Sequence, residues 1–293
     1  MKRLLLTGIS GFLGRRMVQH PQTDWQMVGT YWNTAVNWPG VETVRLNMED
    51  TQAIKAYLDQ QPVEAIIHMA AAANPNRCEQ EPQRSHQINV EASRVLATWA
   101  AARGCPLVFT STDLVFDGEN GPYDEAAAAR PVNQYGKHKL EAEQAILAVH
   151  PTATIARLPL LYGWEEGERT YLGSIVESLR SGGEVKAFGD EYRTMASGRA
   201  AAAGLFMLLE AGLRGRWHLG GAERLSRYDF AQLAAEVFEV PAAGIQHISQ
   251  RDLSMPAARP ADVSLDSRKA YTQGYQPGTV REELQRIYRK YKL

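Results

Sequence analysis

The feature that most constrains the fold is a run of evenly spaced glycines directly after the first apolar segment. Leu4-Leu5-Leu6 forms that segment, and Gly8, Gly11 and Gly14 follow it in the pattern G-x-x-G-x-x-G. Glycine suits such a turn because it tolerates unusual backbone angles and lets backbones approach closely. A strand, this turn and a helix are typical of a dinucleotide site, in which the N–H groups at the helix start bind the pyrophosphate.

Apolar segments of strand length alternate with amphipathic stretches of helix length over the first 160 residues. The pattern predicts strands at 4–6, 27–31, 42–46, 63–68, 106–111 and 154–158, and helices at 11–18, after the cap Asp50, at 83–103 and at 132–149. This alternation predicts an α/β fold with a doubly wound, mostly parallel sheet, the Rossmann architecture.

The second half is less regular and predicts a smaller C-terminal lobe built on the Rossmann core. We expect helices at 170–181, 198–212, 228–238 and 281–291, and strands at 184–188, 215–219 and 245–248. The interpretation is an NAD(P)-binding Rossmann domain over 1–160, to which 198–220 return, and a mainly substrate-binding lobe over 161–293. A ligand crevice is expected between them.

The composition argues against several classes of partner. The formal net charge is −1, which does not favour nucleic acid or an anionic membrane. Cys78 and Cys105 are too few for a disulfide framework and fit a reducing compartment. No apolar run approaches the roughly 18 residues needed to span a bilayer. The seven histidines show no metal spacing. We therefore expect a soluble cytoplasmic protein without a metal.

A candidate catalytic set follows the fifth predicted strand. Tyr135 and Lys139 are four residues apart on a predicted helix and so project from one face. A neighbouring ammonium would lower the pKa of the phenol towards the range useful for acid-base catalysis. Thr112 ends the strand, where open α/β sheets place their ligands. Taken alone, the tyrosine and lysine would be read as a surface pair.

Several segments together resemble the dTDP-4-dehydrorhamnose reductase family, a branch of the extended short-chain dehydrogenases/reductases. The most specific ones are the segment from Ser111 to Gly118, Arg130-Pro131, and the segment from Tyr135 to Glu143. Weaker matches lie at 68–72, 79–82, 88–89, 189–194 and 259–266. Leu114, Met195 and Asn47-Met48 depart from the family pattern, and the first two bear on the choice of sugar.

The resemblance implies hydride transfer at C4 of a nucleotide-linked 4-keto sugar. Tyr135 would protonate the alkoxide, Lys139 would hold the nicotinamide ribose, and Thr112 would bond the carbonyl oxygen or orient Tyr135. The implied cofactor contacts are Gly8, Gly11, Phe12, Leu13, Gly14, Arg15, Asn47, Met48, Met69, Ala70, Ala71, Tyr135, Lys139 and Leu158. The implied substrate contacts are Asn74, Asp113, Phe116 and Arg193, the last as a donor to a phosphate or else a surface arginine.

The choice of cofactor is expected to favour NADP(H), with NAD(H) possible. The second strand ends in Thr30-Tyr31-Trp32-Asn33 and offers no carboxylate for a ribose 2′-hydroxyl. Arg15 and Arg16 would meet a 2′-phosphate, unless they are solvated helix residues.

Three functions remain open at this point. The first is an NADPH-dependent reductase of a nucleotide-linked 4-keto sugar, with a homodimer possible. The second is an NADP-binding protein without turnover, similar to the regulatory subunit of methionine adenosyltransferase. The third is an extended dehydrogenase acting on a non-nucleotide carbonyl. The complete set of Thr112, Tyr135 and Lys139 favours an enzyme.

Overall fold

A parallel sheet of seven strands forms the centre of the protein. The computed structural model describes residues 2–20, 24–164 and 170–292. The strand order is β11-β6-β5-β4-β1-β2-β3, and each neighbouring pair is parallel. The strands are β1 Lys2–Thr7, β2 Trp25–Tyr31, β3 Glu42–Arg45, β4 Ala65–His68, β5 Leu107–Thr112, β6 Thr154–Leu158 and β11 Gly215–His218. The predicted fold class is therefore confirmed.

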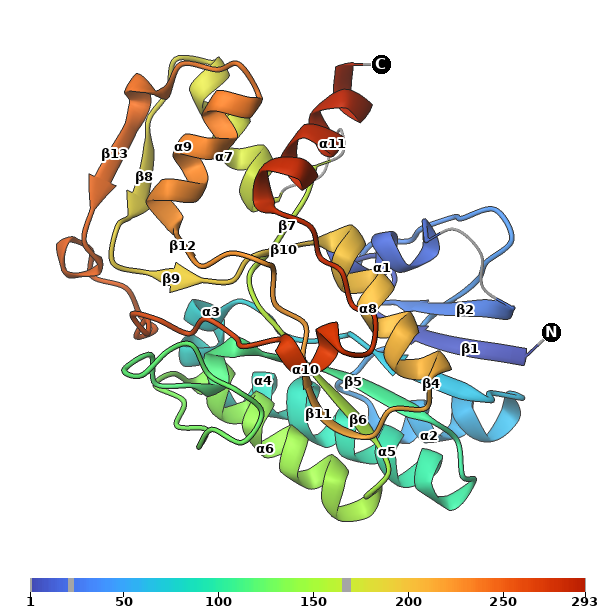
Figure 1. Ribbon diagram of the computed structural model, residues 1–293. Coiled ribbons are helices and arrows are strands. Elements are labelled where there is room, and N and C mark those ends of the chain that lie inside the picture. Colours follow the sequence, from blue (N-terminus) through green and yellow to red (C-terminus); the bar gives the residue numbers. More distant parts are fainter. Residues whose placement is uncertain (1, 21–23, 165–169, 293) are drawn as a thin grey trace.

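Helices cover both faces of this sheet (Figure 1). The two apolar layers are visible in β1, where Leu4 and Leu6 pack in one cluster and Leu5 packs in the other. The first layer contains α1 Phe12–Val18 and α8 Gly198–Glu210, and the second contains α2 Thr51–Gln60, α5 Ala92–Ala102 and α6 Gln134–Val149. Because side chains alternate along a strand, a strand buried on both faces reads as one continuous apolar run.

The predicted helix over 83–103 is not one regular helix. It consists of α4 Pro82–His86, a π-helical segment Gln87–Glu91, and α5, and it is preceded by α3 Pro75–Gln80. Within the π-helical segment the buried Asn89 amide donates to the Ala72 carbonyl (3.1 Å) and accepts from the Ala72 N–H (2.8 Å). Irregular turns of this kind are common at functional sites. This one ties the helix to the segment after β4.

A smaller lobe packs around its own apolar cluster. The smaller lobe consists of α7 Tyr171–Arg180, β8 Val185–Phe188, α9 Arg227–Val237, β13 Ile245–Ile248 and α11 Val280–Lys292. In Figure 1 these elements lie together at the top, away from the large sheet. Two-residue strands connect them to the core: β7 Leu161–Tyr162 with β10 Ala196–Ser197, and β9 Tyr192–Arg193 with β12 Leu225–Ser226.

The remaining elements are short. They are α10 Arg268–Tyr271 and the 3-10 turns Asp113–Val115, Ala242–Gly244 and Gln250–Asp252. Across the described residues, none of the helices has the length and apolar character required to cross a membrane.

Candidate functional site

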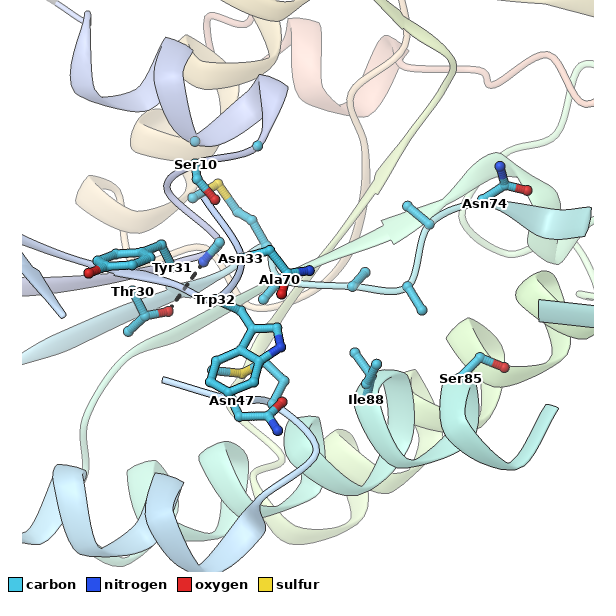
Figure 2. A pocket seen from close by; sticks show the side chains of 18 of the residues that line it. Ser10, Thr30, Tyr31, Trp32, Asn33, Asn47, Ala70, Asn74, Ser85 and Ile88 are labelled. Atoms are coloured by element: carbon cyan, nitrogen blue, oxygen red, sulfur yellow. Dashed lines mark hydrogen bonds between the residues drawn. The ribbon is translucent and has the colours of Figure 1, made fainter. Parts of the chain in front are cut away.

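A cavity of about 650 Å³ opens at the carboxyl ends of β1, β2 and β4. Figure 2 shows Ser10 and Ala70 close to the glycine turn, Trp32 and Asn47 at one end, and Asn74 and Ser85 at the other. The volume is typical of a small-molecule or cofactor site. The predicted residues that line it are Gly8, Gly11, Phe12, Leu13, Gly14, Asn47, Met48, Met69, Ala70, Ala71 and Asn74.

The glycine turn leaves room that a side chain would fill. Gly8 has φ +75°, and a Cβ there would lie 2.9 Å from the Ala70 Cα atom. A Cβ on Gly14 would lie 2.5 Å from the Ile9 Cα atom, so this glycine lets α1 pack onto the turn. A Cβ on Gly11 would meet only the Gly8 carbonyl oxygen, at 3.3 Å. The turn thus fits the close approach of a dinucleotide backbone.

Gly8→Ala should therefore destabilise the protein and weaken NADPH binding. The side chain adds a left-handed backbone cost of about 1–2 kcal/mol and a clash with the Ala70 backbone in the cavity wall. Gly40→Ala is a matched control, because Gly40 has φ +77° and open space around its Cβ position. Thermal melting and NADPH fluorescence titration will compare the two. Equal NADPH affinity in both variants would argue against a role of this turn in binding.

A buried relay that the sequence did not reveal holds the segment after β4. Thr7 Oγ1 accepts the N–H groups of Met69 (2.9 Å) and Ala70 (3.0 Å), so its one proton must go to His68 Nδ1, 2.6 Å away. His68 Nε2 then donates to Ser93 Oγ (3.0 Å). Burial, followed by the charge of Lys139, lowers the His68 pKa to about 3. His68 is therefore neutral and fixes a wall of the cavity.

The predicted catalytic residues meet where β5 ends. Thr112 is buried and Tyr135, near the start of α6, is partly buried. The Thr112 hydroxyl acts to lower the Tyr135 pKa, and α3, whose Cys78 lines the cavity, packs against α6. Asn133 caps α6 by accepting the Gly136 N–H at 2.9 Å, which sets where the helix begins. Tyr135 thus lies at the carboxyl edge of the sheet, whereas Thr112, Tyr135 and Lys139 are not among the described residues that line the cavity.

The expected lowering of the Tyr135 pKa is wrong for this structure. Burial raises this pKa well above its usual value near 10, and the negative charge of Asp113 raises it further. Lys139 is not among the principal groups that shift the Tyr135 pKa, and its Nζ lies 3.9 Å from the ring centroid of Phe109. Counting residues along one helix could not include burial or groups from other elements.

Lys139 is itself strongly affected by burial. Its side chain is almost fully enclosed, and this enclosure lowers its pKa from 10.5 to about 7, against the opposing charge of Glu143. Near neutral pH the amine therefore changes between charged and neutral forms. A neutral amine can donate a hydrogen bond to one ribose hydroxyl and accept one from another.

The lowered pKa of Lys139 predicts that the stability of the protein depends on pH. Between about pH 7 and 10.5 the unfolded chain binds more protons at Lys139 than the folded chain, so this residue makes stability rise with pH. Lys139→Met should remove a rise on the order of 3 kcal/mol over that range. Lys137→Met, an exposed lysine on the same helix, is the control. Urea unfolding at pH 7 and pH 10 tests this, and parallel pH curves for wild type and Lys139→Met would refute it.

Some predicted contacts lie away from the cavity. Among the described lining residues neither Arg15 nor Arg16 occurs; Arg15 Cζ lies 5.9 Å from the Trp38 ring and Arg16 Cζ lies 4.8 Å from the Phe12 ring. Leu158 packs in the core beneath the carboxyl edge, and Leu161 lines the cavity in its place.

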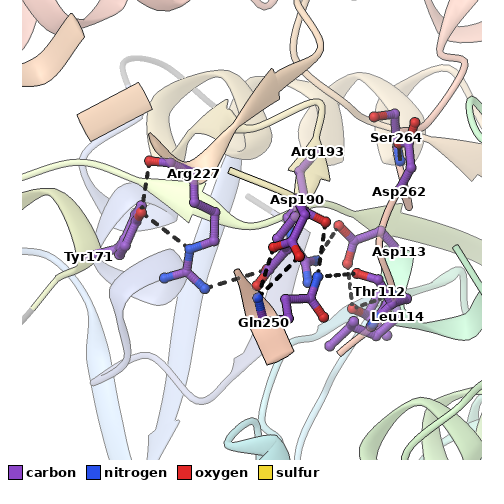
Figure 3. A network of polar contacts seen from close by, with 12 residues as sticks. Thr112, Asp113, Leu114, Tyr171, Asp190, Arg193, Arg227, Gln250, Asp262 and Ser264 are labelled. Carbon is purple, nitrogen blue, oxygen red and sulfur yellow. Dashed lines mark hydrogen bonds and ion pairs between the residues drawn. The ribbon is translucent and has the colours of Figure 1, made fainter. Parts of the chain in front are cut away.

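Three predicted substrate contacts need correction. Asp113 is buried, and its two carboxylate oxygens accept from Thr112 and Arg193, so it does not face a ligand. Phe116 is fully buried, with its ring stacked on Tyr123 at 4.1 Å, and it cannot reach a ligand without unpacking that cluster. The Arg193 guanidinium donates to Asp113 Oδ2 (2.6 Å) and to Glu191 Oε1 (2.9 Å) (Figure 3). Its charge is matched inside the fold, so Arg193 is neither a surface arginine nor an open phosphate donor.

The parallel sheet and the glycine turn at its carboxyl edge define a Rossmann-type dinucleotide-binding protein. The comparisons with known proteins agree with this class. The chain belongs to the RmlD substrate binding domain family, whose match spans residues 1–293.

Several relatives carry different functions. Methionine adenosyltransferase 2 subunit beta of Bos taurus is 33% identical over 282 residues, 93% of this chain and 83% of that protein. The probable low-salt glycan biosynthesis reductase Agl14 of Haloferax volcanii is 30% identical over 266 residues, 89% and 88% of the two chains. A hypothetical dTDP-4-dehydrorhamnose reductase from Sulfolobus tokodaii superposes with a TM-score of 0.84 at 28% identity, covering 95% and 98%.

A structure from Bacillus anthracis extends the likeness in fold. It is a dTDP-4-dehydrorhamnose reductase in complex with NADP, with a TM-score of 0.86 at 22% identity over 99% of this chain and 100% of that one.

Proposed function

We propose that the protein is an NADPH-dependent reductase of a nucleotide-linked 4-keto sugar, similar to dTDP-4-dehydrorhamnose reductase. The observation that carries the proposal is the cavity around the glycine turn, next to which α3, whose Cys78 lines the cavity, packs against α6, the helix of Tyr135 and Lys139. The Sulfolobus tokodaii and Haloferax volcanii relatives support a reductase. The absence of a carboxylate from Thr30 to Asn33 supports NADPH over NADH.

The chemistry assigned to the chain is proton transfer and positioning. Bound NADPH would supply the hydride to the carbonyl carbon. Tyr135 would donate its phenolic proton to the carbonyl oxygen, which becomes a hydroxyl group, and solvent would return a proton to Tyr135. Lys139 would bind the nicotinamide ribose, and Thr112, whose proton goes to Asp113 Oδ1, would orient the phenol as an acceptor. Glycine-turn and β4 backbone groups would hold the dinucleotide.

A second candidate is a cofactor-binding protein that regulates a partner and has no turnover. The similarity to methionine adenosyltransferase 2 subunit beta over most of both chains favours it. A third is reduction of a non-nucleotide carbonyl. A homodimer and a cytoplasmic location stay predictions.

One assay separates these functions. The protein is incubated with NADPH and dTDP-4-dehydrorhamnose, and the nicotinamide absorbance is followed. Oxidation of NADPH supports the reductase. NADPH binding without oxidation on any nucleotide keto-sugar supports the regulatory function and contradicts the proposal. The ratio of kcat/KM for NADPH and NADH tests the cofactor, and a clear NADH preference would contradict that part.

A further inference from the structure

The short strand β9, which connects the smaller lobe to the core, supplies a cation to the turn Asp113–Val115 after β5. Arg193 of β9 lies 80 residues after Asp113, yet its Nη1 atom is 2.6 Å from Asp113 Oδ2. Their side chains are 6% and 1% exposed, so the pair is shielded from solvent. Figure 3 shows Arg193 reaching towards Asp113, Thr112 and Leu114. A shielded pair of this kind keeps much of its electrostatic strength.

Asp113, one member of this pair, is also hydrogen-bonded to Thr112. The Thr112 hydroxyl donates to Asp113 Oδ1 at 3.1 Å and accepts the Leu114 N–H at 3.2 Å. The two carboxylate oxygens of Asp113 are therefore used by Thr112 on one side and Arg193 on the other. As a result the direction of the Thr112 hydroxyl is set by its bond to Asp113.

We propose that Arg193 is a positioning residue for the reduction. It holds the Asp113 carboxylate aligned, so that Asp113 orients the Thr112 hydroxyl beside Tyr135. This inference rests on the proposed reductase function, and it assigns to β9 a part in the active-site geometry.

Arg193 acts electrostatically on both Asp113 and Tyr135. Burial raises the Asp113 pKa above its ordinary value, and the charge of Arg193 and its hydrogen bond oppose this rise without cancelling it. At Tyr135, the charge of Asp113 raises the pKa and the charge of Arg193 lowers it. Loss of Arg193 alone would leave a buried carboxylate without its counter-ion, which is costly in a protein interior.

The same network contains a matched control. Glu191 Oε1 accepts from Arg193 Nε at 2.9 Å and from Arg227 Nη1 at 3.4 Å. Arg227 thus belongs to the same buried network, but it contacts Glu191 and Tyr171 and not Asp113. If Arg193 only joined the lobes through this network, removing either arginine would have similar effects.

The test compares single and double variants of the full chain. Arg193→Met should lower kcat on the order of 100-fold, with the KM for NADPH changed less than about threefold, and Arg193→Lys should recover part of the loss. Arg227→Met should lower kcat less than about threefold. Because Arg193 acts through Asp113, Asp113→Asn with Arg193→Met should match Asp113→Asn alone. Additive losses, or equal losses for the two arginines, would overturn the proposal.

A second readout does not depend on turnover. Hydrogen exchange of the Leu114 amide reports its bond to Thr112, and Arg193→Met should speed this exchange at least tenfold while Arg227→Met leaves it unchanged. If the wild type oxidises no NADPH, the reductase proposal fails, and this exchange still decides whether Arg193 positions the turn. Unchanged exchange in Arg193→Met and Arg193→Lys would refute the positioning role. NADPH binding checks that each variant is folded.

Discussion

Tyr135→Phe should lower kcat for keto-sugar reduction about 1,000-fold, within the range expected for a lost general acid. The variant keeps the ring that packs at the start of α6 and removes only the hydroxyl beside Thr112. NADPH binding, measured by fluorescence titration, should stay within about threefold of wild type, since a lost transition-state contact lowers kcat without weakening ground-state binding.

Tyr57→Phe is the control for removing a tyrosine hydroxyl. Tyr57 lies on α2, and its buried hydroxyl has no hydrogen-bond partner among the described atoms. Its removal should leave kcat unchanged. If Tyr135→Phe retains more than a tenth of wild-type kcat, the phenol is not the proton donor and the assignment of this site is wrong.

Local pattern was sufficient to predict most of the fold. Runs such as Leu4-Leu5-Leu6 become strands buried on both faces, and the predicted strand at 154–158 coincides with β6. The reason is physical: burial of apolar side chains decides these elements, and their spacing is written in consecutive residues. The glycine turn was readable for the same reason, because its backbone requirements are local.

Contacts between segments that are distant in the sequence could not be predicted from local pattern. The π-helical segment depends on Asn89 bonding the Ala72 backbone, and the relay at Thr7 depends on His68. The family resemblance implied that Arg193 binds a phosphate or else is a surface arginine, and its sequence neighbourhood does not show the Asp113 carboxylate 80 residues away. Phe116 was expected at the substrate for its place in a motif, whereas the fold buries it on Tyr123.

The Tyr135 pKa also depends on contacts that the sequence did not show. Helical spacing brings Lys139 near Tyr135, and that pair alone predicts a lowered value. The fold adds burial and the charge of Asp113, which raise the pKa, and places the Lys139 amine over Phe109. Sequence spacing therefore identified the residues of the site but not the electrostatic balance among them.

The second large effect is a loss of stability expected when Glu143 is replaced. Glu143 binds α6, which carries Tyr135 and Lys139, to the central sheet. Glu143 is fully buried and accepts from Ser111 Oγ (2.5 Å), from Arg157 Nε (2.9 Å) and Nη2 (2.8 Å), and from Arg216 Nε (3.3 Å). These contacts join α6 to β5, β6 and β11. Removing one partner of a buried ion pair leaves an uncompensated charge and typically costs about 3–5 kcal/mol.

Glu143→Gln should therefore lower the free energy of unfolding in urea at pH 7 by about 3–5 kcal/mol. Glu141→Gln, an exposed residue on the same helix, should change it by less than about 0.5 kcal/mol. Replacing both Glu143 and Arg157 by Met should recover part of the loss, because no buried charge is then left alone. A loss below about 1 kcal/mol for Glu143→Gln would show that Glu143 holds α6 only weakly.

The loss of stability in Glu143→Gln should depend on pH. Burial acts to raise the Glu143 pKa, but the hydrogen bonds and charge of Arg157 hold it below its ordinary value of 4.5. A carboxylate whose pKa is lowered in the folded chain adds stability above its unfolded pKa and loses that stability as pH falls through the folded value. The difference between wild type and Glu143→Gln should thus be full at pH 7 and shrink below about pH 4.5. A constant difference down to pH 3 would mean that the ion pair with Arg157 is not its source.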